Sequence, residues 1–108
     1  MGVVRYSKNA RDDMLDIWLR IAHDSNVSLA DNIVERIEHR AAVLADHPEI
    51  GIARPEIAPD ARSLVVERWL ILYRVETYGT LINRVVDGAE VHGGGVGGRG
   101  DNWWQFSF

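Results

Sequence analysis

Two apolar stripes of helical period follow one another between residues 7 and 48, with only a short polar link between them. The first stripe recurs at spacings of three and four residues: Ala10, Met14, Ile17, Trp18 and Ile21. The second repeats this spacing: Ala30, Ile33, Val34, Ile37, Ala41 and Leu44. Such spacing places apolar side chains on one face of an α-helix. Because neither helix can bury its stripe alone, the pattern predicts a helical hairpin packed on a second layer.

The ends of both helices carry their own signals. Ser7 stands where the N-cap of the first helix is expected. Residues 24–27 form the polar link, and Ser28 followed by Asp31 resembles a capping box that begins the second helix. His47 and Pro48 are expected to end it, because proline disfavours helical backbone in the residue before it.

Short β-prone runs predict the second layer. Val3–Tyr6 forms the first run, and residues 62–67, 69–76 and 80–86 form three more, after a loop over residues 48–59. The last three are close enough to form an antiparallel meander. The sequence therefore predicts an α+β fold of two layers, in which an antiparallel β-sheet is covered by an N-terminal α-helical hairpin in the order β-α-α-β-β-β.

The character of the chain changes after Ala89. Residues 93–100 are glycine-rich and predict a flexible tether, and the chain ends in Trp103, Trp104, Phe106 and Phe108. We expect a folded domain over residues 1–89 and an atypical C-terminal segment over residues 90–108. Exposed aromatic residues on a tether tend to adhere to the parent domain, a partner or another copy. A translated out-of-frame tail explains the segment equally well.

Composition removes several function classes. The net charge of −4 and the pI near 5.5 argue against a surface that binds nucleic acid directly. The chain has no cysteine, and its four histidines do not have metal-ligand spacing. No apolar run is long enough for a membrane span, and no signal peptide is apparent. We therefore expect a cytoplasmic protein without metal or cofactor.

Several segments in order resemble the ParE branch of the RelE/ParE toxin superfamily. The first landmark comprises Ser7, Ala10, Asp13, Ile17 and Trp18, and the second comprises residues 44–48, Gly51 and Arg54-Pro55-Glu56. Leu72-Tyr73-Arg74 and residues 83–89 are similar to the last two strands of that family. The resemblance covers about Tyr6 to Ala89.

This resemblance implies a type II toxin that is not an enzyme, with a ParD-like antitoxin as partner in a hetero-oligomeric complex and DNA gyrase as target. The chain departs from the family pattern after Ala89, where Glu90-Val91-His92 and the glycine run replace an Arg-Asp pair and a short amphipathic helical end. Because that end contributes to target action in the family, a toxin disabled by its C-terminal segment, which binds antitoxin only, is a further alternative.

An enzymatic alternative is a RelE-like, ribosome-dependent mRNA endoribonuclease. Such a site needs cations that stabilise charge on phosphate and a group that transfers a proton. Arg62, Arg84 and Tyr73 are the candidates, with Arg68 and Arg74 beside them. Residues 54–84 carry five arginines against four acids, which is hardly a cationic groove. Solvated strand arginines and loop ion pairs are the simpler interpretation.

The antitoxin is expected to lay an amphipathic segment into a groove left open by the thin fold. Large aromatic and arginine side chains dominate such interfaces. The expected contact residues come from both helices and the sheet: Trp18, Ile21, Val34, Ile37, Arg62 and Trp69. For Trp18 and Trp69, packing in the core is the alternative.

Overall fold

The computed structural model describes residues 2–89 of the 108-residue chain. Its elements are β1 (Val3–Tyr6), α1 (Lys8–Asp24), α2 (Val27–Ala42), the 3₁₀ turn η1 (Val43–Ala45), β2 (Ile52–Ala53), β3 (Arg62–Val66), β4 (Trp69–Glu76) and β5 (Gly79–Asp87). The predicted α+β order is confirmed, and β2 is an additional short strand inside the segment expected to be a loop. The expected C-terminal segment, residues 90–108, lies outside the described residues.

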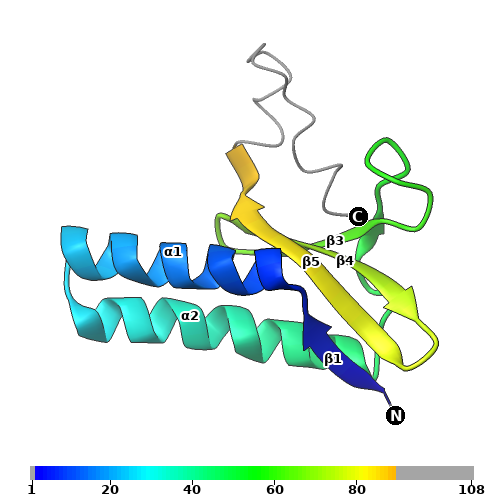
Figure 1. The fold of residues 1–108 in the computed structure, drawn as a ribbon, viewed down its shortest axis with the longest axis horizontal. Helices are drawn as coiled ribbons and strands as arrows, with labels where there is room; N and C mark the ends of the chain where they lie inside the picture. Colours follow the sequence, from blue (N-terminus) through cyan, green and yellow to red (C-terminus); the bar gives the residue numbers. More distant parts are fainter. Residues whose placement is uncertain (1, 90–108) are drawn as a thin grey trace.

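The helical hairpin forms as predicted, with α1 and α2 side by side (Figure 1). The Ser7 hydroxyl accepts a hydrogen bond from the Ala10 N–H at 3.0 Å and caps α1. The capping box predicted at Ser28 is wrong, because α2 begins earlier. Asn26 is its N-cap, and the Asn26 side chain accepts from the Leu29 N–H at 2.8 Å.

The end of the hairpin also differs from the prediction. Helix α2 ends at Ala42 and tightens into η1, so His47 and Pro48 lie beyond the helical segment. No helix within residues 2–89 is long and apolar enough to cross a membrane.

The sheet has the strand order β1-β5-β4-β3-β2. Strands β3, β4 and β5 form the predicted antiparallel meander. Strand β1 adds to β5 in parallel, from Val3 opposite Gly79 to Tyr6 opposite Ile82, so the complete sheet is mixed. A parallel pair needs a long crossover between its strands, and the sequence between β1 and β5 is long enough to provide one.

Both faces of the sheet are covered, by different parts of the chain. The helices pack on one face, where the fully buried side chains include Ile37, Leu44, Ile71, Tyr73 and Ile82. On the opposite face, a smaller cluster joins Leu70, Leu72 and Val86 to Ile57 and Ala61 of the β2–β3 connection. The connection therefore does more than link two elements, because it closes the second face of the sheet.

Candidate functional site

The edge of β5 beyond β1 is covered by a charged contact. Strand β1 pairs with β5 only as far as Ile82. Beyond that point the Asp13 carboxylate of α1 accepts from the Val85 N–H at 2.9 Å and from Nε and Nη2 of Arg84 at 2.7 and 2.8 Å. Each of the two side chains is only 16% exposed. Helix α1 thus supplies a hydrogen-bond acceptor to a part of the β5 edge that would otherwise be open to pairing with another strand.

The edge of β3 has no such cover. Strand β2 pairs only with Arg62 and Ser63, and within residues 2–89 no strand pairs with residues 64–66 on that side. Leu64 and Val66 point toward the helices, whereas Val65 on the other face is 56% exposed. Alternate peptide groups of this segment face outward, as in any edge strand. The β3 edge is therefore a place where an extended segment can add to the sheet.

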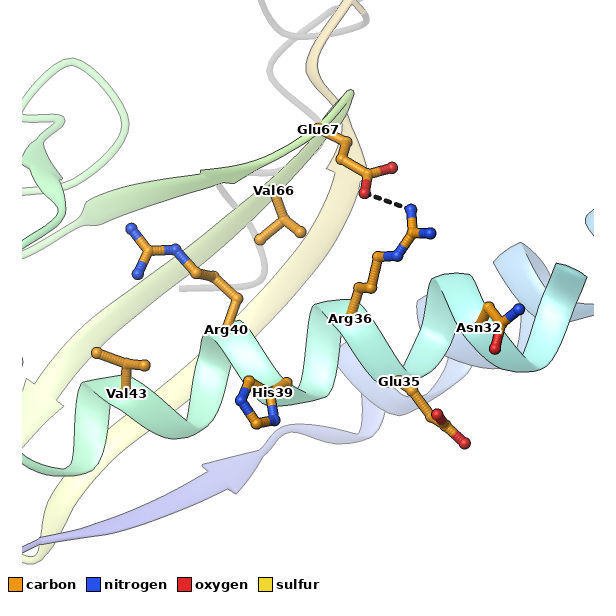
Figure 2. A pocket seen from close by; sticks show the side chains of 8 residues that line it. All are labelled: Asn32, Glu35, Arg36, His39, Arg40, Val43, Val66 and Glu67. Atoms are coloured by element: carbon orange, nitrogen blue, oxygen red, sulfur yellow. Dashed lines mark hydrogen bonds and ion pairs between the residues drawn. The ribbon is translucent and has the colours of Figure 1, made fainter.

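A hollow of about 700 Å³ lies beside this edge, between α2 and the end of β3 (Figure 2). We call it the α2–β3 groove, and it is lined by Asn32, Glu35, Arg36, His39, Arg40, Val43, Val66 and Glu67. Val66 lies between Arg36 and Arg40 as the groove is viewed in Figure 2. A narrow apolar strip with charged sides suits an amphipathic segment better than a small molecule.

Only one of the two arginines that line the α2–β3 groove forms an ion pair within the described residues. Arg36 Nη1 donates to Glu67 Oε2 at 2.7 Å, which joins α2 to the β3–β4 turn. Within the described residues Arg40, one helical turn along α2, has no ion-pair partner. Glu67 has a φ of 56°, a left-handed conformation that is uncommon for residues other than glycine. The groove therefore presents a glutamate in a left-handed backbone conformation and, one helical turn from Arg36, an arginine that is not ion-paired in the described part of the chain.

A buried tyrosine fixes the loop that precedes β2. Tyr73 Oη donates to the Pro48 carbonyl at 2.6 Å and accepts from the Gly51 N–H at 3.0 Å. Arg62 Nη1 donates to the Gly51 carbonyl at 2.7 Å and to the Glu49 carbonyl at 3.2 Å. Burial raises the pKa of Tyr73 above its ordinary value. These bonds hold β2 at the start of β3 and so determine where the open edge begins.

The residues proposed for a nuclease site are engaged in contacts within the fold. Tyr73 is fully buried and bonded to the loop, and Arg62 is bonded to loop carbonyls. Arg84 is held by Asp13, Arg68 pairs with Asp87, and Arg74 pairs with Glu76. Arg84 is less solvated than the sequence suggests, because its ion pair with Asp13 leaves the side chain 16% exposed. None of these contacts brings cations together around a space for phosphate.

The structure separates the six expected antitoxin-contact residues. Ile21 and Trp69 come together in a second hollow of about 360 Å³, which we call the hairpin-end groove. Its apolar residues are Ile17, Ile21, Leu29, Ile33 and Trp69. The indole N–H of Trp18 instead donates to Asp31 Oδ1 at 2.8 Å and joins the two helices.

The other three expected residues serve the fold. Ile37 is completely buried among the core side chains, so it offers no surface to a partner, and that assignment is corrected. Val34 packs partly buried against the same core, and Arg62 fixes the loop before β2. The helical period marks an apolar face without separating its buried centre from its rim, which is why Ile37 was selected.

Sequence reasoning did not select the residues of the α2–β3 groove as a site. Arg36 and Arg40 lie four residues apart, so they share one side of α2. That spacing was the available signal, but it is also typical of any solvated helix face. The partner surface across the groove, Val66 and Glu67, is brought there by the hairpin turn of the sheet.

Comparison with known proteins agrees with this architecture. The family model for the ParE toxin of the type II toxin–antitoxin system parDE matches residues 4–92. Toxin ParE3 of Caulobacter vibrioides is 27% identical over 88 residues, which cover 82% of this chain and 88% of that protein. A solved structure of the chromosomal ParDE system from P. aeruginosa has a TM-score of 0.72 at 21% identity, covering 81% of this chain and 96% of that chain. At that identity the likeness concerns the fold.

Proposed function

The chain belongs to the ParE family of toxins from type II toxin–antitoxin systems, and on that premise we propose that it poisons DNA gyrase and is neutralised by a ParD-like antitoxin. The observation that carries the proposal is the match of the family model over residues 4–92, which spans the described fold. We assign the toxin function to the domain of residues 1–89.

The proposed action is by binding and not by catalysis. The basic residues and the tyrosine that a metal-independent ribonuclease would need are held in structural contacts, as described above. A general base must reach the proton it removes, and a buried Tyr73 with a raised pKa is unsuited to that role. These contacts favour a gyrase poison over a RelE-like endoribonuclease.

Antitoxin binding is proposed at the β3 edge and the α2–β3 groove together. An extended antitoxin segment would pair its backbone with residues 64–66 and direct alternate side chains into the groove. Acidic side chains on that segment would meet Arg40, an arginine of the groove for which no ion-pair partner is found within residues 2–89. The contrast with the β5 edge, which Asp13 covers, supports this choice of edge.

Inducible expression of the full chain in a bacterium that carries a DNA-damage reporter tests the target. We expect growth arrest with the reporter switched on, and inhibition of supercoiling when the purified chain is added to gyrase. Cleaved messenger RNA without a reporter signal would establish the endoribonuclease instead. Normal growth with soluble protein present would indicate a toxin disabled by residues 90–108, which still binds antitoxin.

A charge reversal tests the antitoxin site. We expect Arg40→Glu to weaken binding of the ParD-type antitoxin that neutralises the chain, chosen from a panel, by about tenfold, or roughly 1.4 kcal/mol. Arg11→Glu is the matched control, because Arg11 is an exposed arginine of α1 away from the groove. Equal affinities for the two variants, measured by titration calorimetry, would refute the α2–β3 groove as the antitoxin site.

A further inference from the structure

The hairpin-end groove differs from the α2–β3 groove in its chemistry. It lies between the two helices and the β3–β4 turn, and its floor is formed by Ile17, Ile21, Leu29, Ile33 and Trp69. Leu29 is 39% exposed although it is a large apolar residue. Arg20 and Arg68 stand among its charged lining residues, and the Arg68 guanidinium already lies 5.0 Å from the centre of the Trp69 ring. An apolar floor with charges at the rim is typical of a docking surface for aromatic side chains.

The chain supplies such side chains itself. Residues 101–108 contain both phenylalanines of the protein and two of its four tryptophans, with Asp101 as the single charged residue. Indole rings in water are driven toward apolar surfaces, and arginine guanidinium groups stack on them. The groove therefore offers both kinds of contact that this segment needs.

The described part of the chain ends beside the groove. Asp87, at the end of β5, pairs with Trp69 in the sheet, and its carboxylate pairs with Arg68 at the rim. Trp103 follows Ala89 by 14 residues. The average end-to-end distance of a glycine-rich chain of that length is about 20 Å. Such a tether keeps its end at an effective concentration in the millimolar range, which favours the same molecule over a second copy.

We propose that residues 101–108 dock in the hairpin-end groove of their own chain, with Trp103 or Trp104 against the exposed Leu29 and the half-buried Ile21. This inference depends on the groove and the aromatic segment, and it stands whether or not the chain poisons gyrase. Because Glu67 lines both grooves, the docked segment would adjoin the proposed antitoxin site.

Fluorine NMR of the full chain labelled with 5-fluorotryptophan tests the proposal. Trp103→Phe and Trp104→Phe assign the two resonances, and a synthetic peptide of residues 101–108 gives their undocked positions. We expect at least one of the two resonances to be shifted from the peptide position in the full chain and to return to it in Leu29→Gln. Peptide-like positions for both resonances in the unmodified chain would overturn the proposal.

The control is Leu15→Gln, which changes a leucine of α1 that is 58% exposed and lies outside the groove. It should leave the shifted resonance in place. The Trp18 resonance reports folding, because its indole joins α1 to α2 and does not line the groove. Loss of the shift in both leucine variants, or loss on simple dilution of the unmodified chain, would contradict docking in this groove of the same molecule.

Discussion

At the scale of single residues, the contact between Asp13 and Arg84 joins two layers of the fold away from the two grooves. It joins α1 to β5 across 71 residues of sequence and also satisfies the Val85 N–H. We expect Asp13→Ala to lower the free energy of unfolding by about 3 kcal/mol, because it removes the carboxylate that pairs with the largely buried Arg84 guanidinium and accepts from the Val85 N–H. Urea denaturation of the full chain measures this loss.

The neighbouring aspartate provides the comparison. Asp12 pairs with Lys8 at 3.1 Å on the surface of α1, and their side chains are 62% and 83% exposed. Exposed pairs of this kind contribute at most about 1 kcal/mol, so Asp12→Ala should change the free energy of unfolding very little. Similar losses in the two variants would mean that the contact of Asp13 with β5 is not a major source of stability.

At the scale of elements, the loop before β2 depends on the absence of a side chain at Gly51. A Cβ at this position would lie 2.4 Å from Tyr73 Oη and 2.7 Å from the Ser63 carbonyl oxygen. The Ser63 oxygen belongs to the sheet and cannot move aside cheaply. We therefore expect Gly51→Ala to destabilise the fold by about 1–3 kcal/mol, and thermal unfolding should show a lower Tm.

The first residue of β2 provides the control, as Ile52→Ala. Ile52 follows Gly51 directly and is 68% exposed, so truncating its side chain should change the free energy of unfolding by no more than about 0.5 kcal/mol. An equal drop in Tm for both variants would attribute the effect of Gly51→Ala to the loop in general and not to the contact with Tyr73.

At the scale of the whole molecule, local patterns predicted the layers but not the contacts that join them. Helical spacing predicted the hairpin, and the cap at Ser7 was visible in a few neighbouring residues. The bonds of Tyr73 to Pro48 and of Arg84 to Asp13 bridge 25 and 71 positions, so no local window contains both partners. Strand β2 was missed for the same reason, because two residues form a strand only when β3 is already beside them.

The β3 edge and its groove were equally hidden from the sequence. Whether a strand has an unpaired edge depends on the length of its neighbour in the sheet, and β2 stops opposite Arg62. The apolar stripe could predict that Ile21, Val34 and Ile37 share one side of the hairpin, but not that Ile37 is covered and Ile21 borders a hollow. The sequence thus predicts which residues share a face, but the exposure of each residue depends on tertiary packing that the local pattern does not contain.

The folded molecule as a whole should lose stability in alkaline solution through two tyrosines. Burial, with Glu38 nearby, raises the pKa of Tyr6 to about 12, and burial also raises the pKa of Tyr73. The folded state therefore retains these protons at a pH at which the unfolded state, whose tyrosines have the ordinary pKa of 10.0, releases them. The stabilisation is complete below that value and is lost as pH rises through the folded pKa values.

Unfolding midpoints in urea, measured from neutral to strongly alkaline pH, should accordingly be lower above the ordinary tyrosine pKa. Tyr6→Phe removes the titrating hydroxyl at a partly buried position and should make the alkaline decline shallower while changing the neutral midpoint less. Tyr73→Phe should also make the decline shallower, but it lowers the neutral midpoint as well, because the bonds to Pro48 and Gly51 are lost. If both variants kept the original alkaline slope, proton retention by these tyrosines could not be its cause.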